Sequence, residues 1–184
     1  MEVDLTLHVL RCFEDPNILH VNNKVDPISD FEVICAELML KDLESIIKRE
    51  ERINALLKGA KNKQATSQQI KEWEQELKYV SDIKAALSAG ELERVQALVA
   101  KAKTENVPLT HLLSGKNYLI IANMSEDDYV GKNYENNEHF KKLVAKFGAD
   151  IVIPVSAKIE AELAQLPEAD ANEMMASLGI THRG

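Results

Sequence analysis

The sequence has few of the residues that mark several classes of protein. Its two cysteines, Cys12 and Cys35, lie among apolar residues and have no metal-ligand spacing, so we expect buried thiols in a reducing compartment. The five histidines are scattered and predict no metal site. No apolar run of about 18 residues occurs, and the amino-terminal stretch MEVDLTLHVL is acidic. These absences exclude a membrane-spanning helix and predict no signal peptide, and we expect a cytoplasmic protein.

Aromatic residues and glycine are also scarce, while acidic residues are in excess. Aromatic residues make up 5% of the chain and 7 residues are glycine, a composition that favours helix. The formal net charge is −8, which argues against a general electrostatic attraction to nucleic acid but leaves room for a local basic patch. A chain of 184 residues is long enough for one core, or for a small core with an extended arm.

Three short apolar segments are typical of buried strands: residues 3–10, 117–122 and 150–155. A helical pattern over residues 136–147, ended by Gly148, separates the last two, which predicts a β-α-β unit with parallel strands. Short helices should follow to about Leu178. The first strand carries its apolar residues on one side, which we expect to face the core: Val3, Leu5, Leu7 and Val9.

A long helical region separates the first two strands. Steps of four and three between apolar residues predict one helix from Phe31 to about Lys58, capped by Ser29 or Asp30, and a second after the polar turn 59–67. They should pack as an antiparallel hairpin, followed by a third helix over residues 92–103. The expected seam residues are Met39, Leu43, Ile46, Ile53 and Leu57, then Ile70, Trp73, Leu77, Val80, Ile83 and Leu87. We therefore predict a helical coiled-coil arm, residues 28–105, inserted in an α/β domain formed by residues 1–27 and 106–184.

Polar loops follow the second and third strands. The second strand ends in Asn123-Met124-Ser125-Glu126, and the third in Ser156-Ala157-Lys158. Ligands of open parallel sheets bind outside the carboxyl ends of the strands, so both loops are candidates for a binding site.

The residue types in these loops suit a planar ring. An asparagine amide such as Asn123 can meet a ring edge or brace a neighbouring loop, and the Glu126 carboxylate can accept from a ring N–H. Met124 offers a soft apolar contact, the Lys158 stem can lie across a ring, and we expect the backbone N–H of Ala157 to be free for a base acceptor. The alternative is that Asn123 caps its loop and Glu126 is solvated.

Three stretches of the chain resemble the Obg-like ATPases, also called the YchF family, which belong to the P-loop GTPases. They are HVLRCFEDPNILHVNNKVDPISDFEVICAELMLKDLE, NMSEDDYV and VIPVSAKIEAEL, and the resemblance extends to about Leu178. It implies a partial parallel-sheet G domain with a coiled-coil insertion, from a ribosome-associated ATPase or GTPase linked to redox stress. By match of position, the purine base would be bound by Asn123, Met124, Glu126, Ser156, Ala157 and Lys158.

The resemblance also implies parts that the sequence does not contain. A phosphate-binding loop needs Gly-x-x-x-x-Gly-Lys-Ser/Thr, and neither Gly115-Lys116 nor Gly131-Lys132 fits it. In the family this loop, the switch segments and the Mg²⁺ ligands precede the position of Val3, and a small TGS domain follows that of Leu178. We therefore expect the middle of such a protein, with weak ATP or GTP binding and no hydrolysis alone.

Two other functions stay open from the sequence. The chain could be a non-enzymatic module whose arm binds a ribosomal or protein partner, or a half that regains activity with a separate amino-terminal piece. The first strand would also present an unpaired edge, which favours association between copies of the chain.

Overall fold

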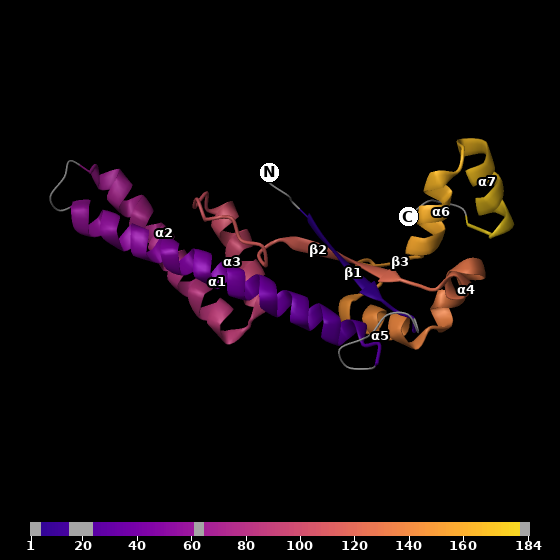
Figure 1. The fold of residues 1–184 in the computed structure, drawn as a ribbon. Helices are drawn as coiled ribbons and strands as arrows, with labels where there is room; N and C mark the ends of the chain where they lie inside the picture. Colours follow the sequence, from indigo (N-terminus) through magenta and orange to yellow (C-terminus); the bar gives the residue numbers. More distant parts are fainter. Residues whose placement is uncertain (1–4, 15–23, 61–64, 181–184) are drawn as a thin grey trace. The chain divides into compact units, whose positions relative to one another are not determined.

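The structure is a computed structural model that describes residues 5–14, 24–60 and 65–180 (Figure 1). It divides into two compact units. The first comprises the residues up to Phe31 together with those from Tyr118 onward, and the second is Glu32–Asn117. Among the residues described, no helix is both long and apolar enough to cross a membrane.

The first unit is built on a three-stranded sheet with the order β1-β2-β3. The strands are β1 (Leu5–Arg11), β2 (Asn117–Asn123) and β3 (Val152–Val155). β2 and β3 run parallel, with Ile120 opposite Val152 and Asn123 opposite Val155. The backbone N–H of Cys12, just after β1, donates to the carbonyl oxygen of Asn123 at 2.9 Å. The predicted partial parallel α/β sheet is therefore confirmed.

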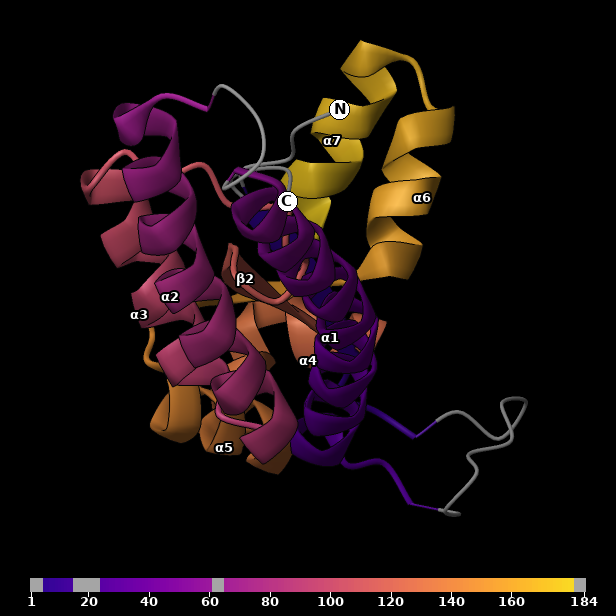
Figure 2. The same ribbon diagram turned by 90° about the vertical axis from the view of Figure 1, so that its left-hand side faces the viewer.

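Short helices follow each of the last two strands. They are α4 (Glu126–Tyr129), the 3-10 segment η1 (Val130–Asn136), α5 (Glu138–Phe147), α6 (Ala157–Gln165) and α7 (Glu168–Ser177). α5 ends at Gly148, whose φ of 95° suits a residue without a Cβ. α6 and α7 pack as a pair around Ile159, Leu163, Ala171 and Met175, and both views show them side by side (Figures 1 and 2).

One face of the sheet is covered by an aromatic cluster. The rings of His8 and Phe31 lie 4.9 Å apart between centroids, those of His8 and Tyr118 5.6 Å apart, and Phe31 also meets Phe147 at 4.8 Å. The prediction of which side of β1 faces the core is wrong. The covered face carries His8 and Leu10, while Leu5, Leu7 and Val9 are exposed by 40%, 56% and 60%. Val3 lies outside the described residues.

The buried imidazole of His8 predicts a pH-dependent stability. Burial lowers the pKa of His8, so below its unfolded value of about 6.5 the unfolded chain binds a proton that the folded chain does not. Stability therefore falls as the pH drops. From pH 7 to 5 we expect the free energy of unfolding of the chain to fall more than that of a His8→Phe variant, measured by urea unfolding. Parallel pH curves for the two proteins would contradict this prediction.

The long helix α1 (Pro27–Ala60) begins earlier than the sequence predicted. The side chain of Asp26 accepts from the backbone N–H of Ser29 at 3.2 Å, and Pro27 takes the first helical position, where its missing N–H costs nothing. Asp26 is thus the cap, and the prediction of Ser29 or Asp30 is wrong.

The second unit is a helical arm made of α1, α2 (Ser67–Ala89) and α3 (Leu92–Thr104), which lie side by side in both views (Figures 1 and 2). Thr66 caps α2 in a capping box, and Gly90 ends it in the left-handed region with φ 72°. All the predicted seam residues except Ile70 form the core of the arm or pack against it. Its fully or nearly buried residues are Ile46, Ile53, Val80, Ile83, Ala86, Leu87, Val95 and Leu112.

Polar side chains inside this seam are paired across the two long helices. Glu50, the polar residue in the apolar pattern of α1, accepts from Ser81 Oγ at 3.1 Å and from Lys84 Nζ at 2.6 Å. Arg49 donates through two nitrogens to both oxygens of the buried Glu76, at 2.6 and 2.8 Å. These pairs fix the register of α2 on α1.

A buried carboxylate fastens the loop that follows α3. Asp42 of α1 is 2% exposed and accepts from the backbone N–H groups of Leu113 and Ser114 at 2.8 and 2.6 Å, and from the Ser114 hydroxyl at 2.5 Å. Leu112, the residue before Leu113, lies in the core of the arm. The segment after α3 is therefore held on α1 by apolar and charged contacts together.

Candidate functional site

The carboxyl ends of β2 and β3 bring the two polar loops together, as the sequence predicts for parallel strands. Asn123 lies opposite Val155, and the backbone N–H of Met124 continues the ladder by donating to the carbonyl oxygen of Val155 at 2.8 Å. Ser125 then caps α4, with its side chain accepting from the N–H of Asp128. On the neighbouring strand, Ser156 leads directly into α6.

Asn123 braces the loop after β3. Its side-chain Oδ1 accepts from the backbone N–H of Ala157 at 2.9 Å. This N–H lies in the first turn of α6, where backbone donors have no partner within the helix. The expectation that the Ala157 N–H is free is therefore wrong, because the nearest side chain of the other loop satisfies it. Asn123 thus braces the neighbouring loop, and its contact with a base stays a prediction.

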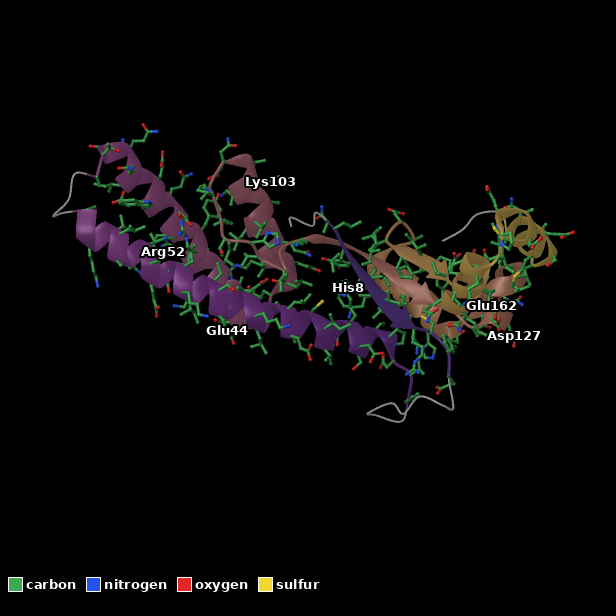
Figure 3. The ribbon with its side chains drawn as sticks, turned by 45° about the horizontal axis from the view of Figure 1, so that its top comes forward. His8, Glu44, Arg52, Lys103, Asp127 and Glu162 are labelled. Carbon is green, nitrogen blue, oxygen red and sulfur yellow. The ribbon has the colours of Figure 1, made fainter. Side chains whose placement is uncertain are left out.

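Glu126 and Lys158 form an ion pair across the same two loops. Lys158 Nζ lies 2.6 Å from Glu126 Oε2, and the two side chains are 66% and 39% exposed. The hydrogen bond to Glu126, followed by its charge, raises the pKa of Lys158, and the charges of Glu162 and Asp127 raise it further (Figure 3). The surface around the ammonium is thus strongly acidic.

The other two predicted residues lie deeper. Met124 is 1% exposed, so its thioether packs in the interior; a contact between Met124 and a base stays a prediction. Ser156 is fully buried, and its Oγ has no hydrogen-bond partner among the described residues. A buried hydroxyl without a partner costs free energy that a bound polar group could recover.

Asn137 holds this edge of the sheet together and was not identified from the sequence. Its Nδ2 donates to the carbonyl oxygen of Cys12 at 3.1 Å and to Asp128 Oδ2 at 2.9 Å. Its Oδ1 accepts from the N–H groups of His139 and Phe140 and so caps α5. An asparagine directly before a helical pattern is a capping signal that could have marked it.

The site offers groups for a planar, hydrogen-bonding ligand and few for a phosphate. Carboxylates surround its one paired ammonium, and a negative field of this kind opposes a polyphosphate. In the part of the chain that is described, no three His, Cys, Asp or Glu side chains gather as metal ligands. The carboxylates therefore do not favour phosphates, and binding of a purine base at this junction stays a prediction.

The sheet, its two loops and the helical insertion define a partial G-domain-like α/β fold. The solved structure of the Schizosaccharomyces pombe YchF GTPase superposes with a TM-score of 0.65 and 25% identity, covering 97% of this chain and 47% of that one. No protein-family model matches the chain.

Curated relatives carry the same family name. The ribosome-binding ATPase YchF of Bacillus subtilis is 35% identical over 184 residues, which are 100% of this chain and 47% of that protein. Obg-like ATPase 1 of Saccharomyces cerevisiae is 31% identical over 177 residues, or 96% of this chain and 44% of that protein. The chain is thus related over its whole length to the Obg-like ATPase, or YchF, family, and it spans about half the length of these relatives.

Proposed function

We propose that the chain is the base-reading and arm-bearing portion of a ribosome-associated ATPase or GTPase of the YchF type. The observation that carries the proposal is the junction of the two loops, where Asn123 holds the first turn of α6 and Glu126 pairs with Lys158. A loop braced in this way is organised before any ligand arrives, which lowers the entropy cost of binding.

A purine would use the groups that the junction leaves available. The Glu126 carboxylate can exchange the Lys158 ammonium for a ring or exocyclic N–H, and the released Lys158 stem can then lie over the ring. The Ser156 hydroxyl has no partner in the described structure but is fully buried, so a purine would reach it only if the loop opened. Asn123 would act by keeping the α6 turn in place.

Hydrolysis needs phosphate and Mg²⁺ groups that this chain does not supply. The sequence contains no Gly-x-x-x-x-Gly-Lys-Ser/Thr loop, and such a loop holds the phosphates in this class of enzyme. We infer weak ATP or GTP binding, independent of Mg²⁺, and no turnover by the chain alone. From the same resemblance we infer a cytoplasmic, ribosome-linked role connected to redox stress.

Equilibrium titration with fluorescent ATP and GTP, with and without Mg²⁺, tests the base site. We expect saturable binding with a dissociation constant near the millimolar range, since a few hydrogen bonds of about 1 kcal/mol each are available. Glu126→Ala should weaken binding about fivefold and change the ATP-to-GTP ratio. Glu138→Ala, which removes an exposed glutamate paired with Lys141 on α5, is the matched control and should change neither. Absence of saturation at several millimolar nucleotide would contradict the proposal.

A second function is favoured by the surface of the arm. Lys48 and Arg52 of α1 are exposed basic side chains with no carboxylate partner among the described residues, although the whole chain is acidic. The arm would then bind a ribosomal or protein partner without any nucleotide chemistry. Association between copies through the edge of β1, the outer strand beside β2, also stays a prediction.

A further inference from the structure

The segment that follows α4 folds back onto that helix. Lys132, within this segment, has a left-handed backbone with φ 62°. A residue with a Cβ is strained in this region, so other contacts must hold the turn in place. Asn133 donates from Nδ2 to the carbonyl oxygen of Asp127 at 3.3 Å, and Asn137 donates to the Asp128 carboxylate at 2.9 Å. Both contacts end on α4.

The side chain of Asn137 uses its full hydrogen-bonding capacity. Its Oδ1 accepts from the N–H groups of His139 and Phe140 at 3.0 and 3.1 Å. Its Nδ2 donates to Asp128 and to the carbonyl oxygen of Cys12. An asparagine amide has two N–H donors and one oxygen with two lone pairs, and here each of them is engaged. One amide therefore joins the end of β1, the helix α4 and the first turn of α5 (Figure 1).

Cys12 gives this junction a fixed reference on the sheet. Its backbone N–H donates to the carbonyl oxygen of Asn123 at 2.9 Å, and its own carbonyl oxygen accepts from Asn137 at 3.1 Å. The backbone of Cys12 thus connects Asn137 with the end of β2, where the first polar loop begins. Because Cys12 is fully buried, this reference cannot move without disturbing the packed interior.

The helix α4 needs such an attachment because it is very short. It has four residues, and a single turn of helix has little stability of its own. Ser125 caps its start by accepting from the N–H of Asp128 at 3.2 Å, and Asn137 holds the Asp128 carboxylate. The same turn carries Glu126, the acidic member of the ion pair between the two loops. The position of Glu126 therefore depends on Asn137.

We propose that Asn137 is a positioning residue that determines the base selectivity of this site. By holding Asp128, it fixes the turn from which Glu126 meets a ring or exocyclic N–H of a purine. Hydrogen bonds weaken steeply as their angle departs from the preferred range, so a small rotation of α4 changes which purine edge is matched. This role rests on the proposed purine site and adds to it a residue that acts through Glu126.

A role in capping α5 alone would leave selectivity unchanged, and the two roles use different atoms. The cap of α5 needs the side-chain oxygen of Asn137, whereas the attachment of α4 needs its nitrogen. Serine is as good an N-cap as asparagine, but its short side chain has no second group that reaches Asp128. Asn137→Ser therefore keeps the cap and removes the attachment. Asp128→Ala removes the attachment from the other side and leaves the cap intact.

Titration with fluorescent ATP and GTP tests the selectivity. Asn137→Ser and Asp128→Ala should each change the ratio of the two dissociation constants by about threefold, and by no more than Glu126→Ala does. In a Glu126→Ala background, Asn137→Ser should leave the ratio unchanged, because the carboxylate that it positions is gone. The control is Asn136→Ser, the same substitution at the preceding exposed residue, which should change nothing.

Amide hydrogen exchange of the chain without nucleotide gives a second readout. The N–H of Tyr129 donates to the carbonyl oxygen of Ser125 in α4, and that of Lys141 donates to the carbonyl oxygen of Asn137 in α5. Asn137→Ser should speed the exchange of the Tyr129 amide by about tenfold, the equivalent of one lost hydrogen bond to a charged group. The exchange of the Lys141 amide should stay the same, since the cap of α5 remains.

The two readouts separate the role of Asn137 from the base site on which it rests. If the unmodified chain binds neither nucleotide, the purine site is wrong, and the selectivity role is lost with it. If the chain binds nucleotide, the role is wrong when Asn137→Ser leaves the ratio unchanged or shifts it equally with and without Glu126. It is also wrong when the Tyr129 amide exchanges no faster in the variant. Equal acceleration at Lys141 overturns it as well, because loss of the α5 cap then explains the effect.

Discussion

Replacing Asp42 with alanine should lower the free energy of unfolding of the arm by about 3–5 kcal/mol. The carboxylate accepts three hydrogen bonds, two from the backbone and one from a hydroxyl, and its removal leaves the two donors of the buried Ser114 and the part-buried N–H of Leu113 without this partner. An unsatisfied buried donor costs about 1–3 kcal/mol. The loop that carries Leu113 and Ser114 would also lose its charged attachment to α1.

Urea unfolding followed by far-ultraviolet circular dichroism measures this change. The control is Glu44→Ala, which removes an exposed carboxylate from the same helix and should shift stability by less than about 0.5 kcal/mol. Equal effects of the two substitutions would mean that the hydrogen bonds of Asp42 contribute nothing beyond helix propensity.

Glu76→Ala should destabilise the arm by about 3 kcal/mol, the second large effect expected. Glu76 is 2% exposed and pairs with Arg49 in a two-pronged geometry, so its loss removes two charge-assisted hydrogen bonds and leaves the partly buried Arg49 guanidinium without its carboxylate. Removing one partner of a buried pair costs more than the pair contributes, because the remaining charge is not compensated.

A double-mutant cycle separates the contribution of the ion pair from the cost of the charge that is left uncompensated. The cycle uses Arg49→Met, Glu76→Met and the double variant, which replaces both charges by apolar side chains and should be more stable than Glu76→Met alone. If the double variant is as unstable as the single one, packing rather than the unpaired charge causes the loss. If Glu76→Ala is neutral, the ion pair is solvated in solution and does not fix the register of the two helices.

Local patterns in the sequence predicted the helices and strands better than they predicted which side chains contact one another. Steps of three and four residues identified the seam from Ile46 to Leu87, since one helix face alone decides those positions. The alternation in β1 was also read correctly in its period, but Leu5, Leu7 and Val9 point away from the covered face. A period of two cannot tell which side other elements will cover.

In the candidate site, too, the position of the loops was predicted but their hydrogen bonds were not. The placement of the two loops side by side follows from the parallel strands, and it was predicted. The hydrogen bond from Ala157 to Asn123 joins residues 34 positions apart, and Asp42 reaches 71 and 72 positions to its partners. A single sequence shows the capacity of each polar group to form a hydrogen bond, whereas its partner depends on the tertiary fold.

The contact between Phe31 and Tyr118 bears on how such an arm can be gained or exchanged. Their ring centroids lie 5.3 Å apart, so the chain leaves the first unit and returns to it at nearly the same point. The entropy of closing a loop grows only slowly with its length, and a structured insertion whose ends already meet adds little to it. We therefore expect the sheet to tolerate arms of different lengths at this position, and a short turn joining Phe31 to Tyr118 should leave β1 and β2 neighbours.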